Sequence, residues 1–152
     1  MIPSGTIDEI LHTKGVSKGT SVWSISPKAT VFEALELMAQ KDIGALLVIE
    51  TGKLVGIVSE RDYSRKVALK GKSSRETPVQ EILTGQLIQV TTSHTVEECM
   101  RLMTTHRVRH LPVLDHDQIV GIVSIGDLVN WIISSQNSTI HQLQTYIAGY
   151  PG

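Results

Sequence analysis

The sequence predicts an α+β fold built from two similar halves, each a small mixed sheet flanked by helices. Residues 30–63 align with residues 95–128 without a gap, and 13 of the 34 aligned positions are identical. Each copy begins with a helix-start sequence and continues into two short apolar runs around a turn. A fixed internal period indicates a duplicated structural unit. Because one small sheet leaves an apolar face that needs cover, we expect the two copies to pack by pseudo-two-fold symmetry.

The main helix of each half is predicted from its first residues. Thr30 with Glu33, and Thr95 with Glu98, match the T-x-x-E sequence of a capping box. Apolar residues then recur at helical spacing along one face. They are Val31, Ala34, Leu35 and Met38 in the first half, and Val96, Cys99, Met100 and Met103 in the second.

A β-hairpin is expected after each main helix, because two apolar runs there flank a short turn. The runs are 45–50 and 53–59 in the first half, and 110–115 and 118–124 in the second. A second helix is expected directly after each hairpin, beginning near Arg61 and near Gly126.

The expected domain boundaries follow from a weaker repeat near the start of each half. IDEIL at 7–11 resembles VQEIL at 79–83, so each half is predicted to begin with a short helix. A stripe of Ile140, Leu143 and Ile147 predicts a separate last helix. The predicted organisation is repeat 1 at 7–70, a linker at 71–86 with the short helix 78–84, repeat 2 at 87–133, and a C-terminal helix and tail at 134–152.

Composition narrows the classes of function. A formal net charge of -1 provides no overall field for nucleic acid or an anionic membrane. No apolar run approaches the ~20 residues that cross a bilayer, and the N-terminus lacks the pattern of a secretory signal. The single cysteine, Cys99, cannot form an intramolecular disulfide, and its place on an apolar helix face favours a buried thiol. We therefore expect a cytoplasmic protein that binds neither nucleic acid nor membrane.

Two equivalent strand-to-helix turns carry the polar residues of interest. GIVSERD at 56–62 and GIVSIGD at 121–127 each end a strand at a serine and begin a helix near an aspartate. Backbone N–H groups at a helix start favour an anion such as phosphate. A carboxylate held there can accept two hydrogen bonds from vicinal hydroxyls, as on ribose. Serine and aspartate at such positions usually act only as helix caps. Their duplication favours a nucleotide site, but a duplicated cap would show the same pattern.

The chain resembles the cystathionine-β-synthase (CBS) domain family over residues 7–133. The resemblance rests on the two turns, on their spacing, and on the stretch that holds Val108, Leu111, Pro112 and Val113. It is similar in particular to small stand-alone CBS pairs, which carry no catalytic domain. The resemblance implies a regulatory module that is not an enzyme and that binds an adenine nucleotide (AMP, ADP, ATP or NAD) or S-adenosylmethionine without a metal. It also implies a homodimer and a regulated protein partner.

Two nucleotide clefts between the repeats are implied by the same resemblance. Ser124 and Asp127 would hold phosphate and ribose in one cleft, and Ser59 and Asp62 would do so in the other. The first cleft would comprise Ser124, Gly126, Asp127, Trp23, Ile43, Gly44, Ala45, Arg109 and His110, and the second would comprise Ser59, Arg61, Asp62, Ile88, Val108 and Arg109.

The two clefts are expected to differ. Arg109 and His110 are the predicted partners of a di- or triphosphate. Arg61 stands at the position that Gly126 occupies in the other repeat. It either contacts phosphate or crowds its own cleft, so we expect the Asp127 cleft to be the more open one.

Two other functions remain open at this point. Ser124, Asp127 and His110 could be read as a catalytic triad, but no G-x-S-x-G elbow accompanies them. His106 and His110 have the spacing of a zinc pair on a helix, but the helix is expected to end between them. The stronger rival is a dimerisation or protein-interaction module with degenerate clefts, in which Trp131 is either core or dimer surface.

Overall fold

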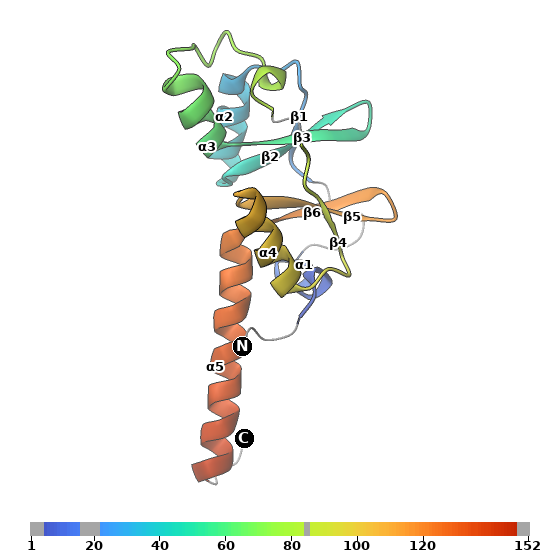
Figure 1. Ribbon diagram of the computed structural model, residues 1–152, viewed down its shortest axis with the longest axis vertical. Helices are drawn as coiled ribbons and strands as arrows, with labels where there is room; N and C mark the ends of the chain where they lie inside the picture. The colour runs from blue at the N-terminus through green and yellow to red at the C-terminus, as the bar shows by residue number, and fades with distance from the viewer. Residues whose placement is uncertain (1–4, 16–21, 84–85, 149–152) are drawn as a thin grey trace. The chain divides into compact units, whose positions relative to one another are not determined.

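The computed structural model describes residues 5–15, 22–83 and 86–148, with side chains described up to residue 136 (Figure 1). The chain forms two compact units. One comprises residues 19–89, and the other joins residues 1–18 to residues 90–152. Each contains a three-stranded mixed sheet with flanking helices. The predicted α+β class is therefore confirmed.

The unit of residues 19–89 has the strand order β1-β2-β3. Strand β1 pairs with β2 in parallel, and β2 pairs with β3 as an antiparallel hairpin. The elements are β1 (Ser24–Ile25), α2 (Val31–Lys41), β2 (Ala45–Glu50), β3 (Lys53–Ser59), α3 (Glu60–Tyr63), the π-helical turn η1 (Ser64–Ala68) and the 3-10 helix η2 (Val79–Ile82).

The second unit repeats this arrangement with the order β4-β5-β6. Again the first pair is parallel and the second is an antiparallel hairpin. The elements are α1 (Ile7–Thr13), β4 (Val90–Thr91), α4 (Val96–His106), β5 (His110–Asp115), β6 (Gln118–Ser124) and α5 (Ile125–Ala148).

The predicted hairpins are confirmed at both places. Thr51 and Gly52 turn the first hairpin with φ of 51° and 77°, and His116 and Asp117 turn the second with φ of 49° and 64°. Two positive φ values in succession suit the right-handed twist of the strands that they join. The two hairpins share the same register, including a shift at the fourth strand residue. The duplicated sequence thus folds into duplicated geometry.

The main helices start at the predicted capping residues. The N–H of Glu98 donates to the Thr95 hydroxyl at 3.0 Å, and the N–H of Thr95 donates to the Glu98 carboxylate at 3.0 Å. In α2 the structure shows only the first half of the predicted capping box, in which the N–H of Glu33 donates to the Thr30 hydroxyl at 3.1 Å. Both helices end at a residue of left-handed conformation, Asp42 in one and Arg107 in the other.

The first short helix packs with the second repeat, which corrects the boundaries of repeat 1 predicted at 7–70. Ile7 is fully buried, and its N–H donates to the carbonyl of His94 at 2.9 Å. The N–H of Val96, the first residue of α4, donates to the carbonyl of Gly5 at 2.9 Å. Helix starts leave N–H groups unpaired. The N-terminal segment therefore supplies the carbonyl group that pairs with the first N–H of α4 in the second repeat.

In the first repeat, the segment around η2 supplies the equivalent carbonyl group to the start of α2. The N–H of Val31, the first residue of α2, donates to the carbonyl of Thr77 at 2.8 Å, and the N–H of Val79 donates to Ala29 at 2.8 Å. The predicted helix at 78–84 is the shorter η2, of 3-10 type, and residues 84–85 lie outside the described residues. It contributes to the first repeat's core, which comprises Val31, Ala34, Met38, Leu46, Val48, Val58, Val67, Val79 and Ile82.

The C-terminal part differs from the prediction of a separate last helix, because α5 is one continuous helix over Ile125–Ala148. The sequence predicted a break near residue 134. The Ser/Asn/Thr-rich stretch at 134–139 weakens helix propensity but contains neither Gly nor Pro. Figure 1 shows α5 running on beyond the other elements of its unit. The stripe of Ile140, Leu143 and Ile147 falls on side chains outside the described ones. Across the described residues, no helix combines the length and hydropathy that a membrane span requires.

Candidate functional site

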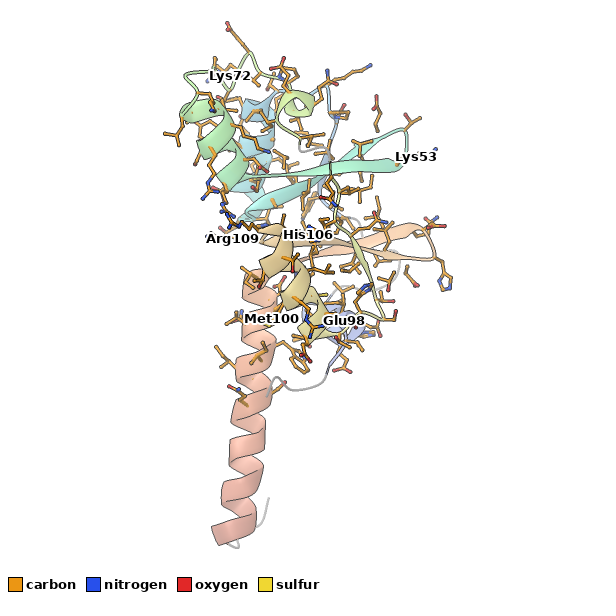
Figure 2. All side chains as sticks on the ribbon, in the orientation of Figure 1. Lys53, Lys72, Glu98, Met100, His106 and Arg109 are labelled. Carbon is orange, nitrogen blue, oxygen red and sulfur yellow. The ribbon has the colours of Figure 1, made fainter. Side chains whose placement is uncertain are left out.

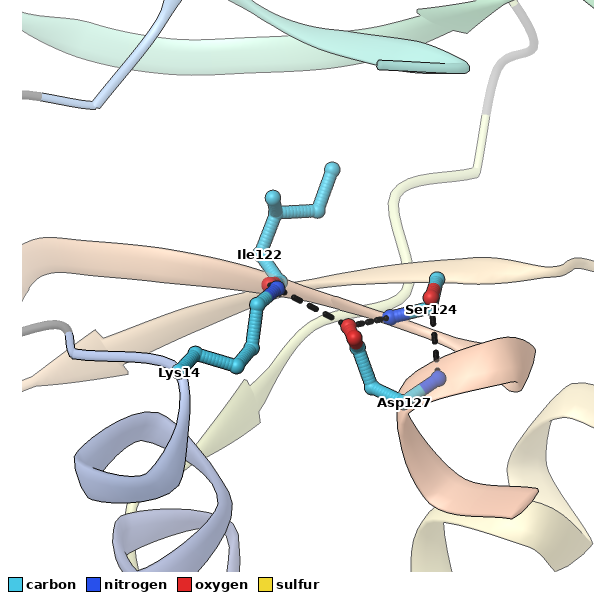
Figure 3. A network of polar contacts seen from close by, with 4 residues as sticks. All are labelled: Lys14, Ile122, Ser124 and Asp127. Carbon is cyan, nitrogen blue, oxygen red and sulfur yellow. Dashed lines mark hydrogen bonds and ion pairs between the residues drawn. The ribbon is translucent and has the colours of Figure 1, made fainter. Parts of the chain in front are cut away.

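The second strand-to-helix turn holds Ser124 and Asp127 in a reciprocal pair of hydrogen bonds (Figure 3). The N–H of Ser124 donates to Asp127 Oδ2 at 2.8 Å, and the N–H of Asp127 donates to Ser124 Oγ at 3.1 Å. Strand β6 ends at Ser124 and α5 begins at the next residue, as predicted. The two side chains therefore do cap the helix. The cap also fixes the carboxylate of Asp127 at the turn.

The first turn has the same arrangement in Ser59 and Asp62. The N–H of Ser59 donates to Asp62 Oδ2 at 2.9 Å, and the N–H of Asp62 donates to Ser59 Oγ at 3.1 Å. Here the Ser59 hydroxyl also lies 3.0 Å from Asp62 Oδ2 and donates to it. The shared capping geometry explains why serine and aspartate recur three residues apart.

Each of the two carboxylates also forms an ion pair with a lysine, and neither pair was predicted from the sequence. Lys14 Nζ lies 2.9 Å from Asp127 Oδ2 and donates to the carbonyl of Ile122 at 3.1 Å. Lys66 Nζ lies 3.2 Å from Asp62 Oδ1. The second pair was detectable, because residues four apart on a helix face each other. The first was not, because 113 residues separate its members and only the packing of α1 on the second repeat brings them together.

The Asp127 carboxylate is ionised at neutral pH. Burial raises its pKa, but the Ser124 N–H and the Lys14 ammonium outweigh burial, so the pKa of Asp127 lies below its usual value. Its side chain is 20% exposed. An ionised and partly accessible carboxylate is a strong acceptor for the hydroxyls of a ligand.

Two of the predicted phosphate-binding N–H groups are already used within the protein. The N–H of Ile125 donates to the carbonyl of Arg109 at 2.9 Å, and the N–H of Asp127 is bound to Ser124. This corrects the expectation that the helix start presents these groups to an anion. A phosphate at this turn therefore depends on cationic side chains more than the sequence suggested.

The segment that precedes each hairpin lies beside the turn of its own repeat. Arg109 is exposed (Figure 2), and its neighbour His110 pairs with Ser124 across the hairpin. In the first repeat the N–H of Glu60 donates to the carbonyl of Gly44 at 3.1 Å, and Ala45 pairs with Ser59.

The remaining large side chains of the predicted clefts are exposed or half-buried. Trp23 is 47% exposed, and Lys41 Nζ lies 4.1 Å from the centre of its ring. Ile43, Ile88 and Val108 are half-buried. The proposed association of Trp23, Ile43, Gly44 and Ala45 with Asp127, and of Val108 and Arg109 with Asp62, stays a prediction.

The two turns differ in the residue that precedes the aspartate by one position. At Gly126 an added Cβ would meet only Ser124 Oγ, at 3.6 Å. Arg61 occupies the equivalent position in the first repeat. It is half-buried, and its side chain is not free of partners. The space at Gly126 agrees with a more open Asp127 site, which remains a prediction.

A metal centre is not formed by the part of the chain that the structure describes, where no three His, Cys, Asp or Glu side chains gather as ligands. His106 is the last residue of α4 (Figure 2), whereas His110 is the first residue of β5. The predicted separation of these two histidines onto different elements is confirmed.

Cys99 is expected to be inert in the folded protein. Its side chain is fully buried, and burial, with the nearby Glu98 charge, raises the pKa of the thiol to about 12. The thiolate fraction at pH ~8 is then about 10⁻⁴. We expect an aromatic disulfide reagent to modify Cys99 only as fast as the protein unfolds, and at once in denaturant. Rapid modification of the native protein would contradict the burial of this thiol.

Comparison with known proteins identifies the class. The CBS domain family matches residues 17–69 and 79–134. The mitochondrial CBS domain-containing protein CBSX3 of Arabidopsis thaliana is 39% identical over 96% of this chain and 73% of its own length. The CBS domain-containing protein YhcV of Bacillus subtilis is 37% identical over 72% of this chain and 77% of its own length.

Solved structures indicate the same family as the sequence comparisons. The CBS domain protein NE2398 superposes with a TM-score of 0.78 at 46% identity, covering 86% of this chain and 99% of that one. A putative signal-transduction protein with CBS domains from Burkholderia ambifaria superposes with a TM-score of 0.80 at 46% identity, covering 87% of this chain and 96% of that one. The fold and the two turns thus define a tandem pair of CBS domains. The chain belongs to the CBS-domain family.

Proposed function

We propose that the chain is a regulatory module that binds an adenine nucleotide at the Ser124–Asp127 turn and signals its presence to a protein partner. The observation that carries the proposal is the ionised, partly exposed Asp127 carboxylate, which the capping hydrogen bonds hold in place. The contacts of Asp127 in the described chain all end on Oδ2. Oδ1 therefore offers lone pairs to a ribose diol.

The adenosine class of ligand is supported by a neighbour in fold. The CBS domain pair of the protein MJ0100 was solved in complex with 5′-methylthioadenosine and S-adenosylmethionine, and it superposes with a TM-score of 0.72 at 22% identity. For the present chain we propose a phosphorylated adenosine ligand of the AMP, ADP, ATP or NAD type. Residues of the first repeat remain the predicted further contacts of this ligand. The ligand then favours one arrangement of the repeats over others, which is a shift in population.

A thermal-shift panel tests this proposal. AMP, ADP, ATP, NAD and S-adenosylmethionine are compared with guanosine nucleotides and zinc. A ligand that binds only the folded state adds about 2.7 kcal/mol of stability at 100 times its dissociation constant. We expect a selective and saturable rise of the melting temperature with an adenine nucleotide. An unchanged melting temperature with every adenine ligand would refute the proposal.

A ligand-independent interaction module is the second candidate. It is favoured by Val129 and Ile133, which lie four residues apart on α5 and are 40% and 49% exposed. Residues at this spacing share one helix face. Under this alternative the module pairs with a second copy or with a partner through that face. The solved neighbours include a hexameric CBS-CP12 protein.

We also propose that the chain forms a homodimer, as the sequence predicts. A protein that is monomeric by sedimentation would contradict this proposal of a dimer.

A further inference from the structure

We infer that Lys14 is a selectivity residue of the Asp127 site, whose ammonium group favours adenosine ligands with a phosphate over uncharged ones. This inference rests on the proposed function, because it concerns the ligand of the same turn. Lys14 follows α1, outside both strand-to-helix turns. No sequence motif of the turn includes it.

The position of the ammonium group is the first argument. Lys14 Nζ donates to Asp127 Oδ2 at 2.9 Å and to the carbonyl of Ile122 at 3.1 Å (Figure 3). An ammonium has three N–H donors. Among the described residues, these two contacts leave one donor for a ligand. The Lys14 side chain is 33% exposed, so a phosphate oxygen has access to it.

The second argument is that the base of this side chain is held firmly. Lys14 is the C-cap of α1, and its backbone N–H donates to the carbonyl of Ile10 at 3.0 Å. Ile7, Ile10 and Leu11 anchor the helix with exposures of 0%, 2% and 4%. A helix C-terminus also favours a cation. The ammonium is therefore preorganised, which lowers the entropy that binding costs.

The third argument is electrostatic. A phosphate brought next to the Asp127 carboxylate meets a like charge, and like charges at short range repel. The N–H groups of Ile125 and Asp127 do not offset this repulsion, because they are bound within the protein. Among the described residues Lys14 is the cation paired with this carboxylate. Its charge therefore favours an anionic ligand at this turn, whereas adenosine carries no phosphate to be repelled.

Titration calorimetry with AMP and adenosine tests this inference on the full chain. Wild type is expected to bind AMP more tightly than adenosine. Lys14→Met is expected to weaken AMP about 10- to 100-fold, the range for a lost hydrogen bond to a charged group. Adenosine should change less than AMP, because it has no phosphate for the ammonium to contact. Lys14→Arg keeps the charge and should keep the preference for AMP.

The control is Lys53→Met, which removes the same charge from the exposed tip of the β2–β3 hairpin (Figure 2) and should leave both affinities unchanged. Circular dichroism melts check that each variant folds, and Lys14→Gln replaces Lys14→Met if the latter does not. An unchanged ratio of the two affinities in a folded Lys14 variant overturns the inference while the proposed function stands. A wild type that binds neither these two ligands nor ADP, ATP or NAD overturns the proposed function itself.

Discussion

Asp127→Asn is expected to weaken AMP binding about 100-fold. The substitution keeps the size of the side chain and an acceptor for the Ser124 N–H, but it removes the negative charge and one acceptor oxygen. Hydrogen bonds to a charged group contribute about 1.5–3 kcal/mol each, and a tenfold loss corresponds to about 1.4 kcal/mol. Isothermal titration measures the loss directly.

Asp62→Asn is the matched control for this prediction. It makes the same change in the other turn, where the carboxylate is capped in the same way. The Asp127 site should then retain its wild-type affinity. Melting curves of both variants record what the altered caps cost in stability, which is about 1 kcal/mol for a typical cap. If Asp127→Asn binds AMP as tightly as wild type at every site, the assignment of this carboxylate is wrong.

Gly5→Ala is expected to destabilise the protein by about 1–3 kcal/mol, the usual cost of overpacking a fitted site. A Cβ on Gly5 would overlap the indole ring of Trp131. Gly5 is buried, and its carbonyl accepts the hydrogen bond that starts α4. The rigid ring cannot move aside as a flexible side chain would. Chemical denaturation measures the free energy of unfolding.

Two further variants make this test specific. Gly126→Ala places a Cβ in open space at the first turn of α5, and alanine favours helix over glycine. Its stability should equal or exceed that of wild type. Adding Trp131→Leu to Gly5→Ala should recover part of the loss, since contacting residues are energetically coupled. A Gly5→Ala variant as stable as wild type would contradict the packing of the N-terminal segment on the second repeat. It would also remove the structural basis for Lys14 at Asp127.

The features that were predictable from the sequence are local ones. The hairpins of 45–59 and 110–124 follow from apolar runs around a turn, and the caps at Thr30 and Thr95 follow from a residue three positions later. Ser124 and Asp127 were predicted to meet because a short turn joins them. Each of these signals spans fewer than about 20 residues, the range over which pattern reasoning is strongest.

The features that escaped prediction depend on contacts between distant segments. The resemblance of residues 7–11 to 79–83 was visible, but it did not show that α1 completes the second repeat. That arrangement arises because the first N–H of α4 needs the carbonyl of Gly5. Lys14 reaches Asp127 only as a result, so no spacing in the sequence could reveal it. The continuity of α5 was not predicted, because the stripe of Ile140, Leu143 and Ile147 indicated a separate last helix.

A crystal structure of the protein grown with AMP tests the central claim most directly. Our proposal predicts density for the nucleotide at the Ser124–Asp127 turn, with the ribose hydroxyls within hydrogen-bond distance of the Asp127 carboxylate and the phosphate beside Lys14. AMP bound elsewhere, or a turn that remains empty at saturating concentrations of AMP, ADP, ATP and NAD in turn, would contradict the proposal and leave the interaction module as the better description.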